Sequence, residues 1–197
     1  MRRRKAAALA GAALTAVLTG CTAGSAGGAT PATGAGGPSG SAAEFRPCPE
    51  QPDRAAAGDR TLPPLTIDCV GGGSLDLARA PGTPTVVNLW GSWCTPCRAE
   101  LPLMQQLADS AGDRVHVVGV ISKDGLPQAG SFAADAGVTF PSAFDGEGQL
   151  MTDLGLNALP YTYFLDAGGA LTYTQTGPVQ SVDELRTLVA EHLGVQL

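Results

Sequence analysis

Two cysteines, Cys94 and Cys97, are separated by two residues in the stretch WCTPCRAE, residues 93–100. Such a pair can supply half of a zinc site, form a structural disulfide or exchange electrons with another thiol pair. Zinc needs four ligands, but the chain has no second CxxC, His116 lies in an apolar run, and His192 is near the C-terminus. We therefore expect no metal site, which leaves a redox pair or a structural bridge.

The position of the pair favours redox chemistry. The apolar, β-branched run from Thr85 to Trp90 predicts a strand covered on both faces, and a helix is expected over 96–110. Cys94 would then lie at the helix start, where free amides and the helix dipole lower a thiol pKa from about 8.5 to somewhere between about 3.5 and 7.5. Cys97, one turn further, could attack a mixed disulfide formed by Cys94. Pro96 suits an early helical position.

The remaining elements also alternate between strand and helix. Asp166 to Gly169 is a hairpin signal, Ser181 and Glu184 form a capping box that begins the last helix, and Pro102 is expected to kink the first one. The other strands are expected over 65–69, 115–121, 140–144, 161–165 and 170–176, and short helices over 128–136 and 153–156. The pattern predicts one α/β domain.

The N-terminus has the features of an export signal. Arg2 to Lys5 are basic, and the apolar run over residues 6–18 is too short to cross a membrane. Leu18-Thr19-Gly20-Cys21 has the form of a bacterial lipobox, so we expect a lipoprotein signal peptide over 1–20 and lipidation of Cys21; the alternative is an ordinary signal peptide with a chance cysteine. Residues 21–43 are poor in large apolar side chains and are expected to be a flexible linker.

The charge of the chain excludes some partners. Residues 1–20 hold four of the twelve Lys and Arg residues, so the rest carries 8 basic and 18 acidic side chains, a net charge of −10. An acidic surface argues against nucleic acid and against electrostatic binding to anionic lipid. Attachment to a membrane would then depend on the lipid at Cys21.

Two further cysteines, Cys48 and Cys69, lie in a Pro- and Gly-rich extension over 44–73, before the domain proper at 74–197. Disulfides persist in exported proteins, and a bridge here would close a loop of 22 residues, worth about 3 kcal/mol in the chain-entropy model. We expect a structural disulfide. A second redox pair is the alternative, although no neighbouring residue suggests stabilisation of a thiolate.

Residues 74–193 resemble the thioredoxin-like superfamily, and within it the membrane-anchored thiol–disulfide oxidoreductases of the TlpA/ResA type. The resemblance runs through SLDLARAPGTPTVVNLWGSWCTPCRAELP, FPSAFD and LGLNALPYTYFLDAGGALTYTQTG. It implies a thioredoxin-like fold, a central mixed β-sheet flanked by helices, with an N-terminal extension and a mid-chain helical insertion. It also implies that Cys94 is the exposed nucleophile and Cys97 the resolving thiol.

The same resemblance assigns roles to the neighbouring residues. Trp93 and Pro96 would shape the site, and Pro160 would be a cis-proline facing the disulfide, with the backbone of Leu159 available to an extended substrate. Glu100 matches an acidic residue that the family carries three positions after the second cysteine, where it could relay the proton of the resolving thiol. The alternative is a solvated helix glutamate.

The sequence differs from two other groups of the thioredoxin-like superfamily, the thioredoxins and the peroxiredoxins. Thioredoxins have a buried aspartate where this chain has Asn88, which cannot take up a proton, so more of the acid–base work would fall on Glu100. Peroxiredoxins have a threonine three residues and a proline seven residues before their reactive cysteine, where Gly91 and Val87 stand here. Peroxidase activity is therefore not expected.

Together these features predict an enzyme without a cofactor, lipid-anchored on the extracytoplasmic face of the membrane. It would exchange its disulfide with cysteine pairs of exported proteins, with apocytochrome c as one candidate substrate and a transmembrane thiol reductant as a candidate electron donor. An oxidant that introduces disulfides would use the same residues. The remaining alternative is a non-catalytic binding lipoprotein whose CxxC is structural.

Overall fold

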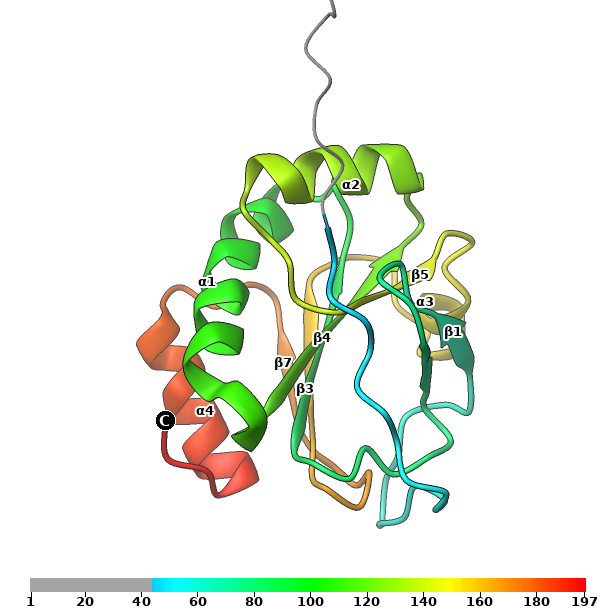
Figure 1. Ribbon diagram of the computed structural model, residues 1–197, viewed down its shortest axis with the longest axis vertical. Coiled ribbons are helices and arrows are strands. Elements are labelled where there is room, and N and C mark those ends of the chain that lie inside the picture. Colours follow the sequence, from blue (N-terminus) through cyan, green and yellow to red (C-terminus); the bar gives the residue numbers. More distant parts are fainter. Residues whose placement is uncertain (1–43) are drawn as a thin grey trace, which may run out of the picture. The chain divides into compact units, whose positions relative to one another are not determined.

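A five-stranded β-sheet in the order β5-β4-β3-β6-β7 lies at the centre of the molecule (Figure 1). It is seen in a computed structural model that describes residues 44–197, so the predicted signal peptide 1–20, the linker 21–43 and Cys21 lie outside the described residues. β3 pairs in parallel with β4, and β4 with β5, whereas β6 is antiparallel to both β3 and β7. The strands are β3 (Thr85–Trp90), β4 (His116–Ser122), β5 (Ser142–Asp145), β6 (Tyr161–Leu165) and β7 (Leu171–Thr176).

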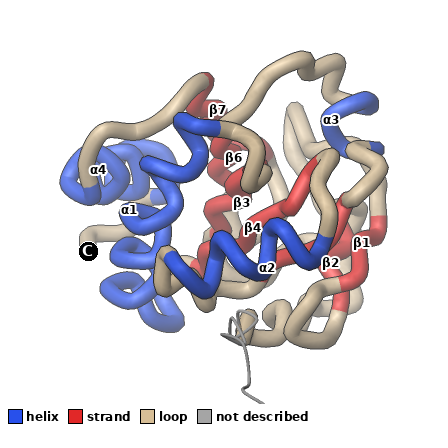
Figure 2. The backbone as a smooth tube through the Cα atoms, turned by 90° about the horizontal axis from the view of Figure 1, so that it is seen from above, coloured by secondary structure: helices blue, strands red, loops and turns tan. Residues whose placement is uncertain are grey.

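Helices cover the sheet unequally. Helices α1 and α4 lie side by side on one face, and the short α3 lies on the opposite side (Figures 1 and 2). The helices are α1 (Thr95–Ala111), α2 (Leu126–Asp135), α3 (Gln149–Asp153) and α4 (Val182–Leu193), and a 3-10 turn, Gly112–Arg114, follows α1. The predicted thioredoxin-like α/β fold with a mixed sheet is confirmed. Among residues 44–197, no helix has the length and apolar composition needed to cross a membrane.

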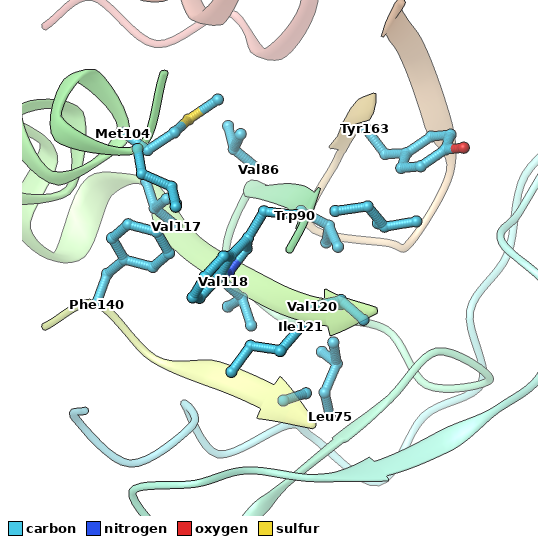
Figure 3. Close-up of a cluster of buried hydrophobic side chains, with 14 of the residues drawn as sticks. Leu75, Val86, Trp90, Met104, Val117, Val118, Val120, Ile121, Phe140 and Tyr163 are labelled. Atoms are coloured by element: carbon cyan, nitrogen blue, oxygen red, sulfur yellow. The ribbon is translucent and has the colours of Figure 1, made fainter. Parts of the chain in front are cut away.

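The core explains why β3 is continuously apolar. All six of its residues are buried, because α1 packs over one face of the sheet and the opposite side is covered as well. Trp90 at the end of β3 and Phe140 before β5 are fully buried in the same cluster (Figure 3). The last residue of β3 is therefore rigidly packed just before the CxxC.

The N-terminal extension covers the β5 edge of the sheet. Strand β1 (Thr66–Asp68) pairs with β2 (Ser74–Asp76), and a disulfide joins Cys48 to Cys69. Cys69 forms an antiparallel bridge with Ala143 of β5, and Val70 N–H donates to the carbonyl of Ser142 at 2.9 Å. An exposed edge strand offers unpaired hydrogen-bonding groups to other chains, and the extension occupies part of this one.

Element boundaries differ from the sequence predictions at several places. The helical turn predicted at 153–156 is wrong, because α3 runs over Gln149–Asp153. The carboxylate of Asp145 accepts hydrogen bonds from the amides of Gln149 and Leu150, which fixes the earlier start. Strand β2 was not predicted, since three residues are too few for a visible alternation. Helix α1 begins and ends one residue outside its predicted bounds and contains Pro102, as expected.

Candidate active site

Cys94 is the N-cap of α1. Its backbone is extended, with φ −88° and ψ 103°, and its sulfur accepts a hydrogen bond from the amide of Cys97 at 3.2 Å. The two cysteines form a disulfide within this first turn, with their Cα atoms 5.3 Å apart. The sulfur that would carry negative charge after reduction is therefore already in contact with a helix amide.

The expectation that Cys94 is exposed is wrong for this disulfide form. Cys94 is only 4% exposed and Cys97 is fully buried. Both sulfurs lie inside the first turn of α1, and the bond between them holds Cys94 against the helix. The order of accessibility remains the predicted one, because solvent reaches Cys94 and not Cys97.

A tight turn precedes the disulfide. The amide of Cys94 donates to the carbonyl of Gly91 at 3.1 Å, and the indole of Trp93 folds back over Gly91. A Cβ at position 91 would lie 2.6 Å from the indole nitrogen, so a larger residue there would displace the indole from this position. Trp93 is nevertheless 51% exposed, and Pro96 is exposed as well. These two side chains form an accessible rim around nearly buried sulfurs.

The Leu159–Pro160 peptide bond is cis, directly before β6. The antiparallel register pairs Leu89 with Tyr161, so the next step of the ladder brings Pro160 opposite Trp90. This is the end of β3 from which the chain enters the Cys94 turn. Leu159 and Pro160 are both buried, and the carbonyl of Pro160 accepts a hydrogen bond from Gly177 N–H at 3.1 Å.

Glu100 lies one turn after Cys97 on α1 and has no solvent-exposed surface, so the alternative of a solvated glutamate is wrong. Its Oε1 accepts from the amide of Val179 at 3.1 Å, and its Oε2 accepts from Asn88 Nδ2 at 3.0 Å. Burial raises the pKa of Glu100 to about 7, the two hydrogen bonds oppose that rise, and the nearby charge of Glu184 adds to it. Glu100 can therefore gain or lose a proton near neutral pH.

Asn88 has a role that the sequence did not indicate. Its Nδ2 also donates to Thr162 Oγ1 at 2.9 Å, so the amide joins the carboxylate on α1 to strand β6. Its Oδ1 and the indole Nε1 of Trp90 are buried without a hydrogen-bond partner among the described residues. An uncharged donor at position 88 leaves the titration of this buried network to Glu100.

Asp124 is a second residue that sequence reasoning missed. It follows β4, and its carboxylate accepts hydrogen bonds from both the amide and the hydroxyl of Ser92. The available signal was positional, since β3 and β4 are parallel and their carboxyl ends meet at one sheet edge. Within residues 44–197, no group of three His, Cys, Asp or Glu side chains is arranged to hold a metal ion.

An open cleft of about 410 Å³ lies beside the turn, between the first turn of α1 and the length of α2. The guanidinium of Arg98 lies 4.7 Å from the ring centre of Phe132, which forms part of the cleft wall. The cleft is lined by Ser92, Arg98, Pro127, Gln128, Ser131, Phe132 and Asp135. Ser92 belongs both to this wall and to the turn before Cys94, so the cleft adjoins that turn, although neither cysteine lines it.

Comparison with known proteins agrees with this geometry. The sequence matches the Redoxin family over residues 56–189. It is 32% identical to the thiol:disulfide interchange protein DsbE of Vibrio cholerae, covering 66% of this chain and 70% of that protein. It is also 32% identical to the thiol:disulfide interchange protein CycY of Rhizobium leguminosarum, covering 68% and 67%. The match to DsbE of Escherichia coli, 36% identical, covers 49% of this chain and 51% of that protein.

Among solved structures, DsbF of Mycobacterium tuberculosis superposes with a TM-score of 0.58 at 27% identity, covering 64% of this chain and 93% of that one. StoA of Bacillus subtilis gives a TM-score of 0.54 at 26% identity, covering 61% and 92%. The chain belongs to the Redoxin family, and it is a thioredoxin-like thiol–disulfide oxidoreductase of the TlpA/ResA type.

Proposed function

We propose that the chain exchanges the Cys94–Cys97 disulfide with cysteine pairs of exported proteins, with Cys94 as the entry sulfur. The difference between the two sulfurs carries this proposal. Cys94 is 4% exposed at the helix start, whereas Cys97 is fully buried one turn further in. An incoming sulfur can approach Cys94 only, while Cys97 is placed to attack Cys94 from inside.

In the reducing direction the steps balance as follows. The Cys94 thiolate attacks one sulfur of a substrate disulfide, forms a mixed disulfide and releases the first substrate thiolate. Cys97 then loses its proton and attacks Cys94 Sγ, which re-forms the Cys94–Cys97 bond and releases the second substrate thiolate. Two electrons pass from the dithiol to the substrate disulfide. A donor thiol pair must then reduce the Cys94–Cys97 bond before another cycle.

Glu100 is the proposed acceptor of the Cys97 proton. It is buried one turn beyond that residue, and its pKa of about 7 allows it to take a proton from a thiol and return it near neutral pH. Asn88 and the amide of Val179 hold the two carboxylate oxygens in place. The reverse sequence, in which a substrate thiolate attacks Cys94, uses the same groups in the opposite order.

Four residues are proposed to receive the substrate polypeptide. Trp93 and Pro96 form the exposed rim beside Cys94, and Pro160 in cis, preceded by Leu159, lies where β6 begins beside the end of β3. The adjoining cleft of about 410 Å³ offers room for side chains that flank a substrate cysteine. An accessible rim around nearly buried sulfurs suits a flexible substrate segment better than a folded surface.

The proposed cellular setting follows from the N-terminal sequence. Cleavage after residue 20 and lipidation of Cys21 would anchor the chain to the extracytoplasmic face of a membrane, with residues 21–43 as a tether. Residues 44–73 would form the disulfide-bonded extension and residues 74–197 the thioredoxin-like domain. Apocytochrome c before haem attachment is our candidate substrate, on the resemblance to the ResA type, and a transmembrane thiol reductant is the candidate donor.

Trapping tests the substrate class. Cys97→Ser should accumulate mixed disulfides with exported proteins, because Cys94 can still attack but nothing resolves the product. The Cys94→Ser, Cys97→Ser double variant is the matched control and should trap nothing. A diagonal gel of Cys97→Ser cells that shows no partner would contradict a protein-disulfide substrate.

A redox titration separates the competing directions. A reductant is expected near the thioredoxin value of about −270 mV, whereas a disulfide-forming oxidant is expected near about −120 mV. A disulfide that stays oxidised below about −300 mV and a Cys94 that resists alkylation would favour the non-catalytic binding lipoprotein. The measurement is an equilibrium titration of residues 44–197 against glutathione and dithiothreitol, read by alkylation and mass spectrometry.

A further inference from the structure

The loop after β4 contacts the turn that precedes the disulfide. Asp124 Oδ2 accepts from the amide of Ser92, and Oδ1 accepts from the Ser92 hydroxyl at 3.1 Å and from Gly125 N–H at 2.8 Å. The carboxylate therefore accepts hydrogen bonds from both donors of Ser92, its amide and its hydroxyl. This contact joins segments that are 32 residues apart in the chain.

The backbone around Asp124 directs it toward Ser92. The β3–β4 register pairs Trp90 with Ile121, so the residues that follow each strand continue side by side beyond the sheet. Between β4 and Asp124, Lys123 has φ 52°, the one positive φ at a non-glycine residue within 44–197. Such a conformation is unfavourable for a residue with a Cβ and persists where surrounding contacts require it. Here the strained residue immediately precedes the carboxylate that contacts Ser92.

Ser92 in turn fixes the position of Cys94. It is the second residue of the turn closed by the hydrogen bond from Cys94 N–H to the Gly91 carbonyl. The indole of Trp93 packs against Gly91 on the same turn. With Ser92 held at its amide and its hydroxyl, the turn has little freedom to change the place at which Cys94 enters α1.

This restraint matters most after reduction. In the disulfide, a covalent bond to Cys97 ties Cys94 to the first turn of α1. Once that bond breaks, three contacts remain to hold Cys94 as N-cap: the hydrogen bond from the Cys97 amide to its sulfur, the hydrogen bond from Arg98 N–H to its carbonyl at 3.1 Å, and the preceding turn. A Cys94 that swung away would lose the amide that stabilises its thiolate.

We propose that Asp124 is a positioning residue for thiol–disulfide exchange: its carboxylate holds Ser92 so that reduced Cys94 stays at the start of α1. The inference rests on the proposed role of Cys94 as the entry sulfur. Asp124 also brings a negative charge to the loop, and a charge alone would act in the opposite sense, because a nearby anion disfavours a thiolate. Geometry and charge therefore predict opposite results for its removal.

Two substitutions separate these effects. Asp124→Asn keeps an oxygen that can accept from the Ser92 amide and an amide that can donate to the Ser92 hydroxyl, but it removes the charge and the acceptor of the Gly125 N–H. Asp124→Ala removes the contact and the charge together. Ser92→Ala removes only the hydroxyl contact, and Asp59→Ala, an exposed carboxylate distant in sequence, is the surface control.

The readouts are the rate of exchange with a small model disulfide at pH 7 and the pKa of the Cys94 thiol, measured by thiolate absorbance on reduced protein. Asp124→Ala should raise that pKa and slow exchange between about tenfold and a hundredfold, the usual cost of a misplaced reacting group. Asp124→Asn should retain most of the rate with a pKa at or below that of the wild type. Ser92→Ala should change both readouts in the direction of Asp124→Ala, by a smaller amount.

Each outcome is decisive. A wild type that does not exchange would overturn the proposed function and this inference with it, whereas an Asp124→Ala variant as active as an active wild type would overturn the inference alone. If Asp124→Asn lowers the rate as much as Asp124→Ala, then keeping both contacts to Ser92 does not preserve exchange, and the inference fails. If Asp124→Ala does not fold, Ser92→Ala and Asp124→Asn still decide between the two readings.

Discussion

The two disulfides of this chain are similarly buried but differ in what surrounds them. Cys48 and Cys69 are 9% and 8% exposed, and Cys94 and Cys97 are 4% and 0% exposed, so exposure would select the wrong pair as reactive. The Cys48–Cys69 bridge joins positions 21 apart in loop segments, whereas the Cys94–Cys97 bridge joins positions 3 apart at a helix start. Within residues 44–197, Cys94 Sγ accepts a hydrogen bond from an amide and neither sulfur of the other bridge does.

The neighbourhoods of the two bridges also differ in titratable groups. A buried glutamate with a pKa near neutrality lies one turn beyond Cys97. Around the other bridge the contacts are backbone hydrogen bonds, from Cys48 N–H to Gly72 and from Cys69 N–H to Gly73, each at 3.0 Å. Groups that stabilise an anion and accept a proton favour exchange, while a backbone network favours a fixed bond. The two disulfides are thus distinguished by the groups that surround them and not by their exposure.

The largest expected effect is on exchange itself. Cys94→Ser should abolish exchange with a model disulfide, because serine cannot form the mixed disulfide. The Cys48→Ser, Cys69→Ser double variant should still exchange below its melting temperature. The measurement is the rate of thiol release from the model disulfide, and full activity in Cys94→Ser or none in the folded double variant would reverse the assignment of the two bridges.

The free energy of unfolding should depend more on the Cys48–Cys69 bridge than on the Cys94–Cys97 bridge, which is the reverse of the expectation for exchange. Loss of the Cys48–Cys69 bridge should lower the free energy of unfolding by about 3 kcal/mol, because an open loop of this length gains chain entropy when the protein unfolds. Denaturant titration of the double serine variant against the wild type gives the difference. The double variant lacking both Cys94 and Cys97 is the control, and it should lose less, since its loop is far shorter. An unchanged unfolding free energy in the first variant would remove its structural role.

Much of the difference between the two disulfides could be predicted from the sequence, because the CxxC lies between a predicted strand and a predicted helix. The buried run of β3 and the helix of α1 both follow from apolar periodicity, and together they place Cys94 at the N-cap. The pairing of Cys48 with Cys69 was expected from the cysteine count in a chain predicted to be exported, and the structure contains that bridge. The mixed sheet followed from family resemblance together with the hairpin signal at Asp166.

The rest of the site could not be predicted because it depends on contacts between distant segments. The burial of Glu100 depends on Val179, 79 positions later, and the restraint on Ser92 comes from a carboxylate 32 positions later. The low exposure of Cys94 depends on how its turn packs, which the order of residues does not reveal. Local patterns therefore identified the reacting atoms, and tertiary structure set their accessibility and protonation.

Glu100 gives a pH-dependent way to sharpen the comparison. The pKa of Glu100 is raised from 4.5 to about 7 in the folded chain. The stabilisation of the folded chain by protonated Glu100 is therefore fully present below pH 4.5 and is lost as the pH rises through 7. Glutamine does not titrate, so Glu100→Gln should not lose stability in this way. As the pH rises from 4.5 to 8, the unfolding free energy of the variant minus that of the wild type should increase by about 3 kcal/mol at most. Denaturant titrations at several pH values measure the gain, and a constant difference would contradict a raised pKa.

Substitution of Asn88 should have the smallest effect, a change in the pKa of the glutamate beside the Cys94–Cys97 bridge. Asn88 Nδ2 donates to Glu100 Oε2, which favours the carboxylate form, so Asn88→Ala should raise the pKa of Glu100 by about one further unit. Thr162→Val is the matched control, because it removes the other acceptor of Nδ2 and leaves the bond to Glu100 in place. Carboxyl chemical shifts of Glu100 followed by NMR report the pKa directly, and the pH profile of exchange should move with it. An equal shift in both variants would mean that packing around β3 and β6, and not the hydrogen bond from Asn88, sets the protonation of the carboxyl group next to the redox pair.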